Sequence, residues 1–168
     1  MVIKYVGKLS LKYKIYNMIT IKDFKIKHPN KVRFIGLDLG SKRIGIAICD
    51  EKQSIATPFK TINKTNTNKL IEEIKVIIEE NNIGGIIVGN PVNMDGTMGR
   101  SAQSVNDVAS NISKNIDLPV ILWDERLSTV GAFNLSSLLD VNVSKRVKTI
   151  DQNAAAFILQ GAIDFLNN

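Results

Sequence analysis

"FIGLDLGSKRIGIAICD" (residues 34–50) is the stretch that most constrains the fold of this chain. Apolar runs at residues 32–39 and 43–49 flank a Gly-Ser-Lys turn, so the stretch predicts two strands joined by a hairpin. Asp38 places a charge near the end of the first run, and the adjacent glycines would let a ligand approach it closely or would simply bend the strands. These glycines are Gly36, Gly40 and Gly45.

The rest of the chain alternates between strand and helix patterns. After a third strand over 54–62, apolar residues at helical spacing predict a helix over 68–81. Alternating strands and helices indicate an α/β fold, a central sheet with helices on both faces, whose ligands bind at the carboxyl ends of the parallel strands. The remaining expected elements are a strand over 83–89, a helix around 102–112, a strand over 118–124 and helices toward the C-terminus.

Charge is distributed unevenly along the 168 residues, a length typical of about one domain. Residues 1–33 hold nine Lys or Arg and one acid, a net charge of +8, whereas residues 34–168 hold 13 basic and 15 acidic residues, a net charge of −2. We therefore expect a basic, partly flexible N-terminal extension over 1–31 and a domain over 32–168. The extension either contacts RNA phosphates or is a solvated tail.

Several classes of protein are excluded by composition. No apolar stretch is long enough to cross a bilayer or to act as a secretory signal, so we expect a cytoplasmic protein without a membrane partner. One cysteine, Cys49, and one histidine, His28, are too few for a disulfide or a zinc site and disfavour Ser-His or Cys-His catalysis. Any metal ion must therefore be bound by oxygen ligands.

Acidic residues from three separate segments are expected at one edge of the sheet. Asp38 ends the first strand, and Asp124 with Glu125 ends the strand over 118–124. Asp151 falls on the apolar stripe of the final helix, in its predicted first turn, and so faces the sheet. Each acid alone could instead cap a helix or begin a turn.

Carboxylates gathered in this way would repel one another unless a cation neutralised them. Mg²⁺ or Mn²⁺ prefers oxygen ligands, and two such ions can activate water and stabilise the leaving oxygen of a phosphodiester. The acids therefore predict a hard divalent cation and phosphodiester hydrolysis.

Four motifs in order resemble the YqgF/RuvX family, whose members are described as pre-16S rRNA nucleases and as Holliday junction resolvase-like proteins. The motifs are "FIGLDLGSKRIGIAICD", "IIVGNPVNMDG", "VILWDERLSTVGA" and "KTIDQNAAAFILQGAIDFL", and the similarity extends from about Phe34 to the C-terminus. The resemblance implies a three-layer, RNase H-like fold with a five-stranded mixed sheet whose second strand is antiparallel. It also implies metal-dependent cleavage of nucleic acid.

The resemblance implies catalytic roles for four acids and metal coordination by three of them. The catalytic acids would be Asp38, Asp124, Glu125 and Asp151, and the metal ligands would be Asp38, Glu125 and Asp151. Because neighbours on a strand point to opposite faces, only one of Asp124 and Glu125 should face the metal, and we slightly favour Glu125. Asn90 departs from the family pattern, which has an apolar residue before Pro91; we expect a change in loop packing only.

Basic residues near these acids are candidate phosphate ligands. Lys42, Arg43 and Arg126 either bind phosphate or are solvated turn charges. A segment shortly before Asp151 is expected to be a mobile lid that contacts the substrate, or a disordered connector. Its basic residues are Lys145, Arg146 and Lys148.

The leading hypothesis is an Mg²⁺- or Mn²⁺-dependent nuclease acting on structured RNA, in maturation of the 5′ end of pre-16S rRNA, as a monomer or homodimer. Cleavage of four-way DNA junctions is the first alternative, and it normally needs two paired active sites. A non-catalytic RNA-binding factor for ribosome assembly is the second. A phosphotransferase is disfavoured because actin-like kinases clamp nucleotide between two such domains, and only one fits in this chain.

Overall fold

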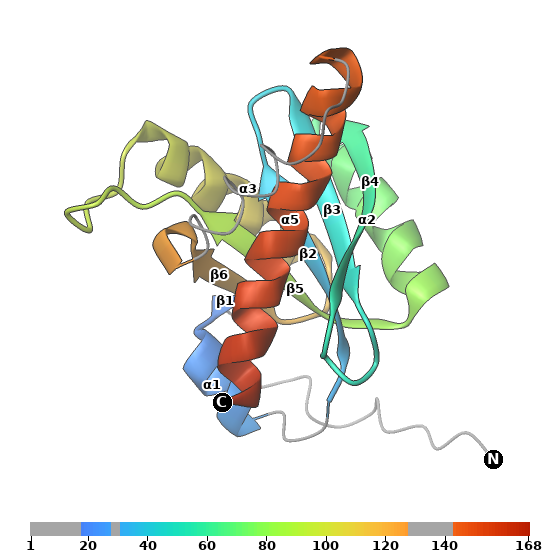
Figure 1. The fold of residues 1–168 in the computed structure, drawn as a ribbon, viewed down its shortest axis with the longest axis vertical. Helices are drawn as coiled ribbons and strands as arrows, with labels where there is room; N and C mark the ends of the chain where they lie inside the picture. Colours follow the sequence, from blue (N-terminus) through green and yellow to red (C-terminus); the bar gives the residue numbers. More distant parts are fainter. Residues whose placement is uncertain (1–17, 28–30, 128–142) are drawn as a thin grey trace.

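A six-stranded mixed sheet forms the centre of the computed structural model, which describes residues 18–27, 31–127 and 143–168, the backbone alone over 143–152 (Figure 1). In spatial order the strands are β1, β6, β5, β2, β3 and β4. Their bounds are β1 Met18–Ile19, β2 Arg33–Leu39, β3 Arg43–Cys49, β4 Ala56–Asn63, β5 Ile83–Asn90 and β6 Val120–Asp124.

The predicted hairpin forms the centre of this sheet. β2 and β3 pair antiparallel, with Asp38 opposite Gly45, and β3 pairs antiparallel with β4. β2, β5 and β6 are mutually parallel, so their carboxyl ends lie at the same edge of the sheet. This edge is the predicted location of the ligand site.

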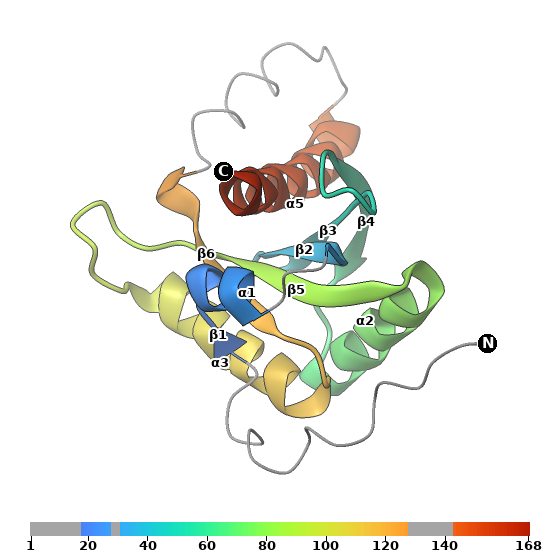
Figure 2. The same ribbon diagram turned by 90° about the horizontal axis from the view of Figure 1, so that it is seen from below.

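Helices cover both faces of the sheet, which confirms the predicted three-layer α/β fold. Figure 2 shows α2 (Thr67–Asn81) and α3 (Arg100–Asn115) on one face and α5 (Val143–Asn167) on the other. α2 begins where Asn66 Oδ1 accepts a hydrogen bond of 2.9 Å from the Lys69 N–H, a typical N-cap. α5 packs closely on β2 because Gly36 lacks a side chain: a methyl there would lie 2.7 Å from Leu159 Cβ.

The sixth strand corrects the expectation of five, and it comes from the basic extension. Residues of β1 pair in parallel with β6, Met18 with Val120, and α1 (Ile21–Lys27) follows. Phe24 of α1 is 2% exposed and packs edge-to-face on Phe34, with ring centroids 5.1 Å apart. A two-residue strand has no periodicity to recognise, and the surrounding lysines obscured this apolar anchor.

The final helix begins earlier than predicted. α5 starts at Val143, so Asp151 lies well inside the helix and not in its first turn. Lys145, Arg146 and Lys148 have helical backbone as part of α5, in keeping with the good helix propensity of Lys and Arg. The rest of that predicted segment lies outside the described residues. Within the described part of the chain, no helix is long and apolar enough to span a bilayer.

Candidate active site

Asp38 is positioned by the alternation of side chains along β2. Ile35 and Leu37 pack against α2 and α3. Phe34 and Gly36 lie on the opposite face of the sheet, against α5. Asp38 therefore points to the α5 side of the carboxyl edge, where it is half-buried. Its neighbour across the hairpin, Gly45, has no side chain to fill this space.

Glu125 reaches the same side from a different strand. β6 ends at Asp124, and the short 3₁₀ turn η1 (Glu125–Leu127) follows directly. The Glu125 carboxylate lies against the backbone of β5: a methyl on Gly89 would stand 2.5 Å from Glu125 Oε1 and 2.5 Å from Ile158 Cδ1 of α5. The absence of a side chain at Gly89 thus makes room for the carboxylate.

The charge of Asp38 acts on Glu125. Burial, followed by the negative charge of Asp38 and then that of Asp124, raises the pKa of Glu125 to about 7. A carboxyl group in this situation resists ionisation unless positive charge is supplied. Carboxyl groups with pKa values raised in this way are concentrated at functional sites.

Asp124 forms an ion pair with Arg126. Arg126 Nε donates to both Asp124 carboxylate oxygens at 3.0 Å, and Arg126 Nη2 donates to Asp124 Oδ2 at 2.6 Å. The Arg126 backbone N–H adds a fourth bond of 3.0 Å to Asp124 Oδ1. These hydrogen bonds from Arg126 lower the pKa of Asp124. Of the two neighbouring acids, Asp124 is therefore paired with Arg126, and Glu125 is the one whose pKa is raised by the charge of Asp38.

Arg126 also fastens the loop between β5 and α3 to the end of β6. Arg126 Nη1 donates to the carbonyl oxygens of Asn93 at 3.5 Å and Met94 at 3.4 Å. Asp95 Oδ1 orders the loop from within by accepting from the Thr97 N–H at 2.9 Å and the Thr97 hydroxyl at 2.6 Å. Arg126, for which the sequence leaves open phosphate binding or a solvated turn charge, thus contacts Asp124 and this loop.

The remaining predicted residues lie in the β2–β3 hairpin and in α5. Lys42 is exposed in the β2–β3 turn, and Arg43 is half-buried at the start of β3. α5 crosses β2 where Ala155 faces Gly36, and Asp151 precedes Ala155 by one helical turn, toward the carboxyl edge (Figure 1). The side chains of Asp151 and of the three basic residues of α5 lie outside the described residues. Among the side chains that are described, no three His, Cys, Asp or Glu converge as a metal site.

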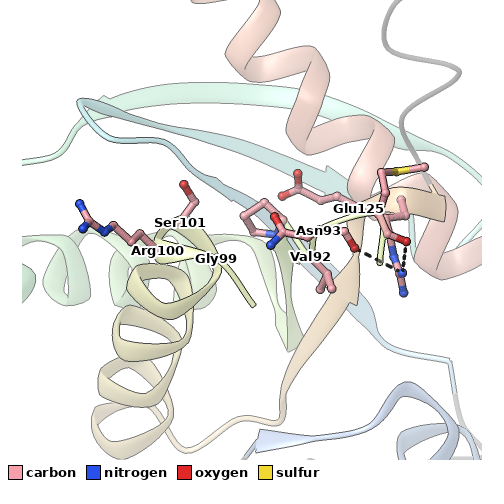
Figure 3. A pocket seen from close by; sticks show the side chains of 9 residues that line it. Val92, Asn93, Gly99, Arg100, Ser101 and Glu125 are labelled. Carbon is pink, nitrogen blue, oxygen red and sulfur yellow. Dashed lines mark hydrogen bonds between the residues drawn. The ribbon is translucent and has the colours of Figure 1, made fainter. Parts of the chain in front are cut away.

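An open cavity of about 540 Å³ adjoins Glu125, and sequence reasoning missed part of its lining. Figure 3 shows Arg100 and Ser101, from the start of α3, on the side opposite Glu125. In the sequence, these residues are marked only by "GRS" (residues 99–101) before the helical pattern, and this short motif does not indicate a binding site. Asn90 is a second surprise: its Oδ1 is buried without a hydrogen-bond partner among the described residues.

Comparisons with known proteins agree with this fold. The family model RuvX, described as Holliday junction resolvase, matches residues 32–165. A protein of Pelagibacter ubique named "Putative pre-16S rRNA nuclease" is 91% identical over 151 residues, which cover 90% of this chain and all of that protein. A protein of the same name from Paramagnetospirillum magneticum is 42% identical over 132 residues, 79% of this chain and 85% of that one.

Two solved structures share the fold at low sequence identity. Thermus thermophilus RuvC in complex with a Holliday junction matches with a TM-score of 0.51 and 10% identity, over 78% of this chain and 91% of that one. The yeast mitochondrial Holliday junction resolvase matches with a TM-score of 0.50 and 13% identity, over 86% and 83%. The resemblance in the sequence is thus confirmed, and the chain belongs to the RuvX family of Holliday junction resolvases.

Proposed function

We propose that this chain is a divalent-metal-dependent nuclease that hydrolyses phosphodiester bonds and processes the 5′ end of pre-16S rRNA in the cytoplasm. The observation that carries the proposal is the approach of Asp38 to Glu125 at the carboxyl edge of three parallel strands. The printed name of the 91% identical relative supports the choice of substrate.

The donor set fits a hard divalent cation. Glu125 is a carboxyl whose pKa is raised to about 7 by burial and by the charge of Asp38, and a bound cation would reverse both effects. Mg²⁺ or Mn²⁺ would be held by Asp38, Glu125 and Asp151. When bound, such an ion polarises a phosphodiester and lowers the pKa of a coordinated water molecule.

The chain's own residues then hold and orient the substrate. Asp38 and Glu125 keep their carboxylates on one side of the edge, and Gly89 leaves the space that Glu125 occupies. Lys42 and Arg43 would attract substrate phosphates beside the β2–β3 turn, where their positive charge offsets the negative charge of the scissile phosphate. Lys145, Arg146 and Lys148 would contact the nucleic-acid backbone from the start of α5. Asp124 acts through Arg126, which fixes the neighbouring loop.

Cleavage of a pre-16S rRNA 5′-end fragment tests this proposal. We expect wild-type protein to cut the RNA with Mn²⁺ or Mg²⁺ and to stop when a chelator is added. Asp38→Asn and Glu125→Gln should each lower the rate at least about 100-fold, because each removes a charge that the cation needs. Asp107→Asn, which neutralises an exposed acid on α3, is the matched control and should retain the wild-type rate.

Equal cleavage by wild type and Asp38→Asn would show that the proposed site is wrong. RNA binding that survives loss of all three acids, without any cleavage by wild type, would favour a non-catalytic assembly factor. The family description gives a specific reason to include a four-way DNA junction as a second substrate. Cleavage of the junction but not of the RNA, by a dimeric protein, would identify a resolvase.

A further inference from the structure

The cavity beside Glu125 has a lining suited to a nucleotide. Pro91, Val92 and Met94 supply apolar surface, and Arg100 and Ser101 supply a cation and a hydroxyl. Figure 3 places Val92 and Asn93 between Glu125 and these two residues of α3. The cavity therefore runs from the candidate catalytic acid across an apolar wall to groups that can bind a phosphate.

Met94 is displayed in this lining by a loop that is held rigidly. Met94 is 89% exposed, the highest exposure among the large apolar residues of the described chain. The Gly96 N–H donates to the Asn93 carbonyl oxygen at 2.8 Å, and the Asn93 N–H donates to the Thr97 carbonyl oxygen at 3.0 Å. Arg126 Nη1 donates a hydrogen bond of 3.4 Å to the Met94 carbonyl oxygen. The ordered backbone presents the Met94 side chain to solvent, where its flexible thioether can adapt to an apolar ring that packs on it.

The charges in the cavity are arranged for one phosphate group. Arg126 is neutralised by its ion pair with Asp124, at 2.6 Å. Arg100 forms no ion pair with any side chain that the structure describes. Its guanidinium is thus the cation at this end of the cavity that can take a phosphate, with the Ser101 hydroxyl beside it.

We propose that this cavity binds one unpaired nucleotide of the substrate, adjacent to the phosphodiester at Asp38 and Glu125. The base packs on Pro91, Val92 and Met94, and a backbone phosphate reaches Arg100 and Ser101. A base inside a duplex is stacked and paired, so only an unpaired or extruded base can enter a recess of this kind. The inference rests on the proposed function and deepens it: the site selects single-stranded RNA next to a structured region.

Equilibrium binding to three RNA hairpins with the same stem tests the proposal. One hairpin is blunt, one carries a short single-stranded tail, and one carries the same tail with abasic nucleotides. Fluorescence anisotropy is measured in chelator with the full chain carrying Asp38→Asn, so the result does not depend on cleavage or on a metal ion. We expect the tailed hairpin to bind about ten times more tightly than the blunt hairpin, and the abasic hairpin, whose tail phosphates can still reach Arg100, to have an intermediate affinity.

Variants of the two exposed methionines in the same loop separate the proposed contact from a general effect. Met94→Ala should weaken binding of the tailed hairpin about five- to tenfold and leave that of the abasic hairpin unchanged, and Met94→Leu should restore it. Met98→Ala is the matched control, since Met98 is 56% exposed but does not line the cavity. Arg100→Ala should weaken binding of both tailed hairpins, unlike Lys114→Ala at the other end of α3.

Equal affinity for blunt and tailed hairpins would overturn the proposal. So would equal losses for Met94→Ala and Met98→Ala, or a loss for Met94→Ala that is the same with and without bases in the tail. These results are distinct from failure of the proposed function, which is read from cleavage by wild type and Asp38→Asn.

Discussion

The burial of Glu125 beside Asp38 makes the stability of the folded chain depend on pH. The pKa of Glu125 rises from 4.5 to about 7 on folding, so the folded state binds this proton more tightly than the unfolded state. The free energy of unfolding must therefore decrease as pH rises from about 4.5 through about 7. Ionised Glu125 in the metal-free protein is a source of instability that a cation would remove.

We predict that Glu125→Gln stabilises the metal-free protein at neutral and alkaline pH. The gain should be about 1 to 2 kcal/mol above pH ~7.5, after allowance for partial solvent screening, and should vanish below pH ~5. Urea unfolding in chelator at several pH values measures it, with Glu79→Gln, an exposed acid on α2, as the control for loss of charge. A gain that grows toward acid pH would contradict this reasoning.

The contrast between Asp124 and Glu125 leads to a prediction about metal affinity. Glu125→Gln should weaken Mn²⁺ binding at least about tenfold, because it removes a proposed ligand. Asp124→Asn should change the dissociation constant only about twofold, since the amide oxygen of the new side chain can still accept a hydrogen bond from Arg126. Calorimetric titration with Mn²⁺ measures both. The reverse order of effects would identify Asp124 as the ligand.

At the scale of elements, the end of β5 must lack a side chain for Glu125 to occupy its position. We predict that Gly89→Ala displaces the carboxylate, which a Cβ would approach to 2.5 Å, and weakens Mn²⁺ binding about tenfold or more. Gly85→Ala is the matched control: its Cβ would meet Phe34 Cε1 at 2.5 Å on the same strand, away from the site. It should lower stability yet leave Mn²⁺ affinity unchanged, and equal affinities in both variants would refute the requirement.

α1 is an element that the basic composition of the extension concealed. We predict that Phe24→Ala lowers the free energy of unfolding by about 3 kcal/mol, because Phe24 is 2% exposed and packs on Phe34. Ile26→Ala, in the same helix but 79% exposed, should change it by less than about 0.5 kcal/mol. Urea denaturation compares the two. Similar values for both variants would mean that α1 does not contribute to the core.

At the scale of the whole molecule, the sequence concentrates positive charge in its first 33 residues, with a net charge of +8, whereas residues 34–168 carry −2. Residues 1–17 contain four lysines and no acid. If they contact RNA, replacing the four lysines by alanine should weaken binding and reduce the slope of log affinity against log salt by up to about 3, since each neutralised phosphate contributes about 0.7. Anisotropy over a series of salt concentrations measures the slope. An unchanged slope would indicate a solvated tail.

Most of the fold was predictable because burial imposes a period on the sequence. Leu70, Ile74 and Ile77 are buried at the helical spacing that predicted α2, and the apolar runs around Asp38 became the hairpin of β2 and β3. The two-residue β1 and the early start of α5 were not predictable in this way. β1 has too few residues for any period, and the polar first turns of α5 hold good helix formers without an apolar stripe.

By itself, the sequence determined the order of the elements from β2 onward, the sheet edge formed by the carboxyl ends of the parallel strands and the family to which the chain belongs. Only the tertiary structure decided that Glu125 is buried within the electrostatic influence of Asp38, that Arg126 connects Asp124 to a loop, and that a cavity adjoins Glu125. The physical reason is that periodicity reports which side of an element is buried. The direction of a side chain after a strand ends is set by contacts with residues distant in the sequence, here Gly89 and Ile158.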